Sequence, residues 1–260
     1  MVRSVDRAID VMVMVGKSEE PIALPQITRE LDLPRTTAFS IVKTLSSRGI
    51  LKFEEGRGYR LGPLVASLAQ SAAPSLSLTG VVHPWLEKIS RETSETAFLA
   101  VPFGDQIVFI DKVEPSQVIR YSAQIGTRRP LYCTAHGKIV LATRSAEELE
   151  AYMASTPLEA HTNKTIVEPA ALRKEMERIR KQGFAVSDGE FNIEAYGISV
   201  PVAAGRGGPL IGMISAVGPT PRMKPRRNEV AKLLLSIAAS LSADCANVEV
   251  PASEVGKSDT

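Results

Sequence analysis

Apolar residues recur at helical spacing near the start of the chain. Val5, Ala8, Ile9, Met12 and Val13 are separated by one, three or four positions, which gathers their side chains on one face of a helix. We therefore expect a first helix that buries this face in a small core.

Two further helices follow, joined through a tight turn. The first runs from about Pro25 to Leu31 and stops at Asp32-Leu33-Pro34, because a residue before proline is disfavoured in the helical conformation. Pro34 suits the first turn of the next helix, which is predicted over Pro34 to Ser47. The buried face of that helix is expected to hold Ala38, Ile41, Val42 and Leu45, and its outer face Arg35, Thr36, Phe39, Ser40, Lys43 and Ser47.

Alternating apolar residues then predict a β-hairpin. Leu51 and Phe53 lie on one side of residues 54–58, and Tyr59 and Leu61 lie on the other. The segment between them contains two glycines, as a hairpin turn requires. Three helices followed by such a hairpin are the layout of a winged helix-turn-helix.

The rest of the chain mixes helices and strands. Residues 63–80, rich in Ala, Ser and Leu and interrupted by Pro74, are expected to form a linker helix at a domain boundary. Beyond it, strand pairs joined by tight turns, with helices between them, predict an antiparallel α+β domain. The expected strands are Ala97–Phe103, Ile107–Val113, Val118–Ser122, Ile198–Ala203 and Leu210–Val217, and the expected helices are Trp85–Thr93, Thr134–Arg144, Ala146–Ala154, Pro169–Gln182 and Arg226–Cys245.

Length and composition agree with two ordinary globular domains. The chain has 260 residues, of which 44% are apolar and 23% charged, and this excludes a wholly disordered or fibrous protein. Two cysteines are too few for a disulfide framework, which fits a reducing cytoplasm, and no segment reaches membrane-spanning length. We expect a DNA-binding domain over 1–62, the linker helix over 63–80, a second domain over 81–247 and a flexible tail over 248–260.

The net charge of +2 conceals a local basic segment. From Pro34 to Arg60 the sequence holds six basic residues against two acidic ones, as the neutralisation of DNA phosphates requires. The alternative is a solvated surface on a small helical domain. The candidate DNA-binding residues are Arg35, Thr36, Thr37, Phe39, Ser40, Lys43, Arg57 and Arg60.

Several ordered motifs together resemble one family. SVDRAIDVMVMV, LPRTTAFSIVKTLSSRGILKFEEGRGYRLG, PLYCTAHGKIVLA and GFAVSDGEFNIEAYGISVPV occur in the order found in the IclR family of bacterial transcriptional regulators. The resemblance spans residues 3–242, nearly the whole chain. It implies a winged helix-turn-helix, a linker helix used in dimerisation and a C-terminal effector-binding domain related to the GAF fold.

The same resemblance implies a pocket in the second domain. Family members carry other residues at the positions of Phe39-Ser40, Gly197 and Ala203, so neither operator nor effector is carried over from the family. Glu190 matches an acidic position of the family and is expected either to hold its loop or to touch the ligand. The matching pocket positions are Val118, Tyr121, Ala135, His136, Ser187, Ala195, Gly197, Ser215 and Val217.

The residues at the start of the predicted helix 134–144 agree with an anion site. The first N–H groups of a helix have no intrahelical acceptor and attract an anion, and Gly137 lacks a side chain that would block approach. A small carboxylate is the natural candidate for the effector. The competing interpretation is that Thr134 only caps its helix and Gly137 only permits close packing.

The same segment also contains residue types found in catalytic sites and in metal sites. Cys133 and His136 are spaced like a nucleophile and its base, but no third orienting group is identifiable. With His83 or His161 they form no recognised metal-ligand spacing. We therefore expect no catalytic residue, no metal and no cofactor.

The sequence thus predicts a cytoplasmic transcription factor that binds operator DNA and responds to a small effector. Paired reading heads usually address symmetric half-sites, so a dimer or tetramer is expected, with Leu64, Val65, Leu68 and Ala69 as candidate contacts. The alternative is an enzyme or metabolite-binding protein whose N-terminal domain contacts other proteins. Steeply salt-dependent DNA binding separates the two, because only the regulator releases counterions from operator DNA.

Overall fold

The computed structural model describes residues 3–18, 20–71, 73–205 and 207–245. The chain divides into two compact units, Met1–Ala73 and Pro74–Thr260. The tail expected over 248–260 lies outside the described residues. Within the described part no helix is long and apolar enough to cross a membrane.

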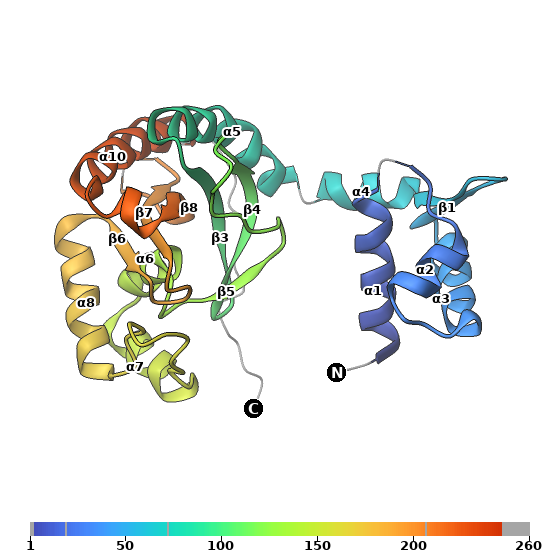
Figure 1. The fold of residues 1–260 in the computed structure, drawn as a ribbon, viewed down its shortest axis with the longest axis horizontal. Helices are drawn as coiled ribbons and strands as arrows, with labels where there is room; N and C mark the ends of the chain where they lie inside the picture. Colours follow the sequence, from blue (N-terminus) through green and yellow to red (C-terminus); the bar gives the residue numbers. More distant parts are fainter. Residues whose placement is uncertain (1–2, 19, 72, 206, 246–260) are drawn as a thin grey trace. The chain divides into compact units, whose positions relative to one another are not determined.

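The described residues of the first unit form four helices and a two-stranded sheet (Figure 1). Its core is small: the buried residues come from the first three helices, the hairpin and the turns between them. The elements are α1 (Arg3–Gly16), α2 (Leu24–Glu30), α3 (Arg35–Ser47), β1 (Leu51–Glu54), β2 (Gly58–Leu61) and α4 (Pro63–Ser71).

Helix α3 forms where the sequence predicts it and buries the predicted face. Ala38, Val42 and Leu45 are buried, and Ile41 packs against the same core. Asp32, with a φ of 47°, turns the chain between α2 and α3, and Leu33 closes that turn onto the core. The outer side of α3 is thereby left to polar and basic residues, as the amphipathic pattern predicts.

The hairpin also forms in the predicted register. Leu51 pairs with Leu61 and Phe53 with Tyr59, and Tyr59 forms a bridge with Ile22 on its other side. Gly58 has a φ of 122°, and a Cβ atom there would lie 2.5 Å from the carbonyl oxygen of Ile22. Only glycine therefore allows the wing to lie this close to the segment before α2.

The expected buried face of α1 is wrong in part. Val11 and Val15 are buried, whereas Val5, Ile9 and Val13 are 54%, 51% and 48% exposed. Ala8 and Met12 pack partly against the core, as expected. The helix carries apolar residues on more than one face, and spacing alone does not decide which face meets the core of its own unit.

The second unit is built on a six-stranded antiparallel sheet with helices on both faces. The strand order is β5-β4-β3-β8-β7-β6, so hairpins β3-β4 and β7-β8 meet at the centre. This confirms the α+β fold. The strands are β3 (Thr96–Phe103), β4 (Gln106–Val113), β5 (Arg128–Pro130), β6 (Ala185–Asp188), β7 (Ala195–Ala203) and β8 (Leu210–Pro219), and the helices are α5 (Ala73–Thr93), α6 (Ala135–Thr143), α7 (Ala146–Ser155), α8 (Pro169–Gln182), α9 (Thr220–Met223) and α10 (Arg227–Asp244).

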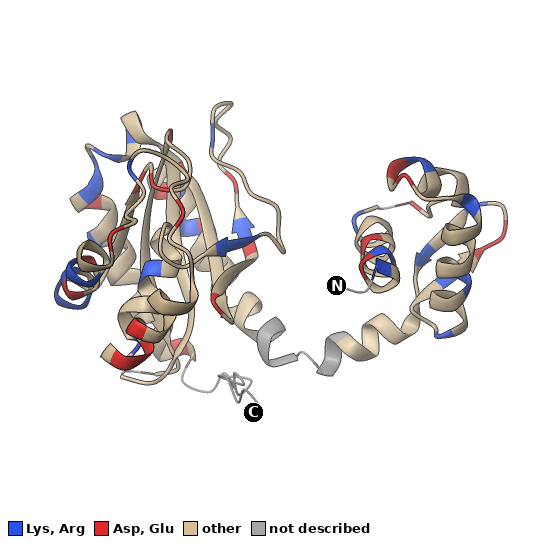
Figure 2. Ribbon diagram, turned by 90° about the horizontal axis from the view of Figure 1, so that it is seen from below, with Lys and Arg blue, Asp and Glu red and all other residues tan. Residues whose placement is uncertain are grey.

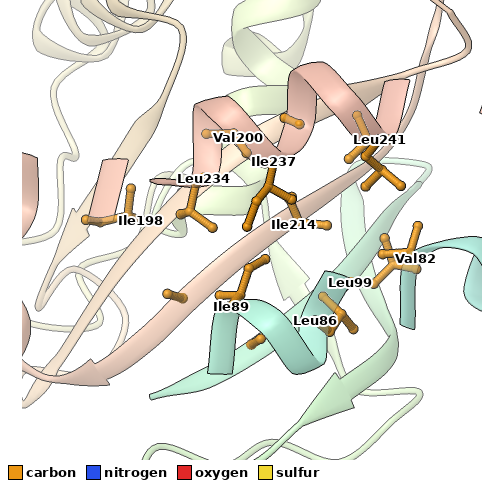
Figure 3. Packing of buried hydrophobic residues seen from close by; sticks show 14 of the residues in the cluster. Val82, Leu86, Ile89, Leu99, Ile198, Val200, Ile214, Leu234, Ile237 and Leu241 are labelled. Carbon is orange, nitrogen blue, oxygen red and sulfur yellow. The ribbon is translucent and has the colours of Figure 1, made fainter. Parts of the chain in front are cut away.

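Alternation along the central strands divides the core into two layers. In β3, Ala97 and Leu99 face the layer that α5 and α10 cover, whereas Phe98 and Ala100 face the layer of α6, α7 and α8. Figure 3 shows the first layer, where side chains of α5 and α10 meet those of β3, β7 and β8. The second layer contains the candidate site.

One expected strand of the second unit, Val118–Ser122, is wrong, and two strands, β5 and β6, were missed. Residues 118–122 form no strand: Arg120 turns back to pair with Glu114, and the edge of β4 is taken by Arg128–Pro130 instead. Strand β6, which pairs with β7, was not predicted because its four residues lie between a helix and a loop without alternation.

The helices around the boundary also differ from expectation. Helix α4 ends at Ser71, and α5 is one helix of 21 residues from Ala73 to Thr93 rather than a linker helix followed by a separate helix at Trp85. Pro74 lies in the first turn of α5, where proline costs no hydrogen bond, and Pro84 is accommodated inside it. The use of residues 63–80 as a linker between the two domains stays a prediction.

Candidate effector cavity and DNA interface

A cavity of about 50 Å³ lies in the second core layer, where β4, β5, β7 and β8 approach the start of α6. Aromatic and small apolar side chains form much of its wall, and one cation and several neutral polar groups complete it. The lining residues are Phe109, Tyr121, Arg129, Thr134, Ala135, His136, Ser187, Phe191, Asn192, Ala195, Gly197 and Val217.

The first turn of α6 forms one wall of the cavity. Thr134 caps this helix, because its hydroxyl accepts a hydrogen bond from the Gly137 N–H at 3.0 Å. A Cβ atom on Gly137 would lie 2.3 Å from the Cα of Leu131, so glycine permits close packing here. Capping and close packing are therefore observed. The N–H groups of Ala135 and His136 precede any intrahelical acceptor and lie at the cavity wall.

His136 is a neutral group in this wall. It is 3% exposed, its Nε2 lies 2.7 Å from the hydroxyl of Ser215, and its ring meets that of Phe109 edge-on at 5.1 Å. Burial lowers the pKa of His136 to about 3. The imidazole therefore offers hydrogen bonds but no positive charge to a ligand at neutral pH.

Lys138 holds the cavity wall from behind. Its ammonium donates to Glu175 of α8 at 3.0 Å and to Glu190 at 2.6 Å, and the lysine is 1% exposed. Glu190 begins the loop whose Phe191 and Asn192 line the cavity. Of the two roles expected for Glu190, the structure shows the one that holds the loop.

Seven of the nine predicted pocket residues line the cavity. Ser215 lies behind His136 as its hydrogen-bond partner and is fully buried. Val118 is a wrong prediction: it is 92% exposed, because residues 118–122 do not form the strand that would have turned it inward. The predicted residues that line the cavity are Tyr121, Ala135, His136, Ser187, Ala195, Gly197 and Val217.

Five lining residues were absent from the predicted pocket positions, and one of them, Thr134, was expected only as the cap of its helix. Phe109 looked like an ordinary core residue of its hairpin, and Arg129 stood in a segment predicted as neither strand nor site. Phe191 and Asn192 lie in an irregular loop, where periodicity carries no signal. Two adjacent arginines, Arg128 and Arg129, precede the predicted start of the helix 134–144. This pair was the one signal in the sequence for a cation near the pocket.

The alternative chemistries find no support in the geometry. Burial and the charge of Glu190 raise the pKa of Cys133 to about 12, so this thiol is protonated, and the Nε2 of His136 pairs with Ser215 and not with Cys133. His83 pairs with Asp111, and His161 packs between Tyr132 and Phe191. Across the described part of the chain, no three His, Cys, Asp or Glu side chains gather as metal ligands do.

The candidate DNA residues form an exposed face of the first unit. Arg35, Thr36, Phe39, Ser40 and Lys43 are exposed along α3, and Thr37 is half-buried beside them. Among the described residues, Arg35 and Lys43 make no ion pair. The two arginines of the wing, in contrast, form ion pairs.

Both wing arginines contact acidic side chains of their own unit. Arg57 pairs with Glu20 and lies 3.6 Å from Glu54, and Arg60 pairs with Glu54 at 3.2 Å. Figure 2 shows Lys and Arg of the first unit in blue, with acidic residues in red among them. Among the described candidate DNA-binding residues, the basic side chains without an ion pair therefore lie on α3 and not on the wing.

Comparison with known proteins decides the family. The model of the IclR helix-turn-helix domain matches residues 4–55, and that of the bacterial transcriptional regulator IclR C-terminal domain matches residues 70–243. The chain belongs to the IclR family of bacterial transcriptional regulators. This confirms the resemblance seen in the sequence motifs, and with it the effector-binding nature of the second domain.

Individual relatives agree. This chain is 29% identical over 227 residues to the HTH-type transcriptional regulator BhcR of Paracoccus denitrificans. The alignment covers 87% of this chain and 81% of BhcR. It is 27% identical over 192 residues to the transcriptional repressor IclR of Escherichia coli. That alignment covers 73% of this chain and 70% of the repressor. The crystal structure of Thermotoga maritima IclR superposes with a TM-score of 0.74 at 25% identity, covering 94% of this chain and 98% of the other.

The comparisons also decide between the two functional classes. The matching families and these relatives are transcriptional regulators and not enzymes. The first unit is accordingly a helix-turn-helix domain of a transcriptional regulator, and the regulator is assigned no catalytic residue.

Acid should destabilise the second unit through His136. The pKa of this histidine is about 3 when folded against 6.5 for an unperturbed histidine, so the unfolded chain takes up the proton first as the pH falls. The stability linked to the neutral imidazole is complete above pH 6.5 and is lost as the pH falls towards 3, by about 2 kcal/mol at pH 5.

Urea unfolding followed by the fluorescence of Trp85, the one tryptophan, measures this loss. Between pH 7 and pH 5, His136→Gln should lose less stability than the wild type does. Equal losses in the two proteins would contradict the assignment.

Proposed function

We propose that this regulator binds operator DNA in the cytoplasm through α3 and its wing, and that a small organic anion in the cavity changes its affinity for DNA. The observation that carries the proposal is that the family's two parts are each equipped for their task. One presents an exposed basic helix, and the other encloses a cavity with anion-attracting groups. Family membership alone does not identify the effector, so the proposal of an anion rests on the groups that line the cavity.

The DNA-binding surface follows from exposure and charge on α3. Arg35 and Lys43 lie two turns apart on the outer side, each free of acidic partners among the described residues, so both are available to phosphates or base edges. The ion pairs of Arg57 and Arg60 are exposed, and such pairs contribute little to stability. Exchange of these carboxylates for DNA phosphates at the wing therefore costs little.

Phe39 is the residue of α3 best suited to apolar base contact. It is 51% exposed, so its ring is open to contact with DNA. A phenyl ring on the outer side of a reading helix is able to pack on the methyl group of thymine in the major groove.

Replacement of Arg35 or Lys43 by Ala should weaken operator binding without unfolding the first unit. Each loss of one phosphate contact should lower the slope of log affinity against log salt by about 1. Fluorescence anisotropy of a labelled operator fragment at several salt concentrations measures the effect. Arg173→Ala, which removes an exposed arginine of α8, serves as the control and should bind as the wild type does.

The same assay tests Phe39. Phe39→Ala should relax preference at one base position while the melting temperature stays unchanged, and Phe103→Ala, equally exposed in the second unit, should change neither quantity.

Wild-type binding by both the Arg35 and Lys43 variants would show that α3 is not the reading helix.

Self-association is supported by apolar side chains left exposed on the first unit. Val5, Ile9 and Val13 share one face of α1, and Leu64 and Leu68 are 38% and 53% exposed on α4. The side chain of Ala69 lies outside the described residues, and Val65 is half-buried. A small unit rarely exposes so many large apolar residues unless another surface covers them, and a second copy of this chain satisfies the symmetry of paired half-sites.

Ile9→Asp should therefore shift the regulator towards the monomer, because a carboxylate would be buried without a partner in the contact. Light scattering at micromolar concentration, with and without operator DNA, measures the mass. Ile125→Asp places the same charge at an isoleucine of similar exposure in the second unit and should leave the mass unchanged. A monomeric wild type under both conditions would contradict self-association through this face.

The effector response is proposed to depend on the space in front of Gly197. A Cβ atom at this position would meet Val217 at 3.4 Å and Ala135 at 3.8 Å, which are ordinary contacts, so the Cα–Cβ direction points towards Val217 and the first residue of α6, both of which line the cavity. A larger side chain at Gly197 would occupy the volume that an effector needs.

Gly197→Leu should abolish the change in operator affinity that an effector causes, while effector-free DNA binding persists. A thermal-shift screen of small organic acids supplies the effector, since a ligand at about 100 times its dissociation constant adds about 2.7 kcal/mol of stability. Gly197→Ala is the control for folding. A normal response by Gly197→Leu would place the effector elsewhere.

A further inference from the structure

Among the described residues that line the cavity, Arg129 is the one that carries a charge. No Asp, Glu or Lys side chain reaches the wall, and His136 is neutral. The guanidinium of Arg129 lies over the ring of Phe191, with its central carbon 4.7 Å from the ring centroid. This contact joins the guanidinium to another residue of the cavity wall.

The hydrogen bonds of Arg129 leave one edge of its guanidinium without protein acceptors. One terminal nitrogen, Nη1, donates to the carbonyl of Arg128 at 2.9 Å. The Nε–H is buried and has no acceptor among the described groups, and no carboxylate pairs with this arginine there. Buried donors in proteins are nearly always satisfied, so an unsatisfied one inside a cavity calls for a partner.

The same edge binds carboxylates elsewhere in this molecule. Arg222 donates to the two oxygens of Glu95 from Nε at 2.7 Å and from Nη2 at 2.8 Å. Arg173 presents the same two nitrogens to Glu150. Arg129 lines the cavity and pairs with no carboxylate among the described residues, and the two parallel N–H groups of an arginine match a carboxylate in geometry as well as in charge.

We propose that Arg129 is the residue that selects a carboxylate as the effector. This rests on the proposed function and deepens it by naming the group that supplies the charge. The effector carboxylate accepts hydrogen bonds from Nε and Nη2 of Arg129, while the first-turn N–H groups of α6 and the side chains of Ser187 and Asn192 face the rest of the ligand.

The size of the cavity restricts the acid. A dry cavity of about 150 Å³ accepts a benzene ring, and this one is about one third of that volume. The inference is therefore a carboxylate with a short carbon chain, of about two to four carbons, rather than an aromatic acid.

Paired probes that differ only in charge test the selection. Calorimetric titration of the full chain with acetate, propionate, butyrate, pyruvate, lactate and benzoate, and with propionamide as the uncharged match of propionate, measures both preferences. The wild type should bind at least one short acid, and should prefer propionate to propionamide and short acids to benzoate. In Arg129→Gln the binding of the short acids should weaken roughly 10- to 100-fold, and the preference for propionate over propionamide should vanish.

A neighbouring arginine provides the matched control. Arg128 belongs to the same strand, is exposed, and lies over Phe103 outside the cavity. Arg128→Gln removes the same charge and should bind the acids as the wild type does. Arg129→Lys, which keeps the charge but not the fork, should lie between the wild type and Arg129→Gln.

The outcomes separate this inference from the proposed function. Unchanged acid binding by Arg129→Gln, or a wild type that binds none of the acids, would overturn the inference. An uncharged effector that acts through the cavity and is blocked by Gly197→Leu would also overturn it, while leaving the proposed function intact. Conversely, acid binding that depends on Arg129 but leaves operator affinity unchanged would support the inference and refute the proposed function.

Discussion

One ammonium group, that of Lys138, lies between two carboxylates inside the second unit, and the cavity depends on this contact. Every residue of α6 from Ala135 to Ala142 is buried, so a charge in this helix has to be neutralised within the protein. Glu175 supplies one carboxylate from α8 and Glu190 supplies the other from the loop after β6. Loss of one partner of a buried ion pair typically costs 3 to 5 kcal/mol, so helix, helix and loop are held as one body.

The two carboxylates around Lys138 are not equivalent. Burial raises the pKa of Glu190, even though Lys138 opposes the shift. Burial acts in the same direction on Glu175, but Lys138 and the additional cation Arg178 together lower the pKa of this carboxyl. Glu190 belongs to the loop that also carries Phe191 and Asn192, so its ion pair with Lys138 ties this part of the cavity wall to α6.

The sequence predicts those parts of the regulator in which one periodicity dominates. Helix α3, the wing and the two central hairpins follow from amphipathic or alternating patterns, and the motifs identify most of the cavity. Val5, Ile9 and Val13 were assigned to the core because α1 has apolar residues on several faces. Val118 was misplaced because β-branched composition at 118–122 resembles a strand, whereas the ion pair of Glu114 with Arg120 turns the chain there. Arg129 and Lys138 were missed because their roles depend on residues more than thirty positions away.

The proposed function requires that binding in the cavity of the second unit and binding at α3 of the first unit are coupled. Binding coupled between two sites is reciprocal, so the measurement is a complete cycle: operator affinity with and without a saturating short-chain acid, and acid affinity with and without operator. Both affinities should change by the same factor, about 5- to 150-fold. Operator affinity that is identical in the presence and absence of the saturating acid would contradict it.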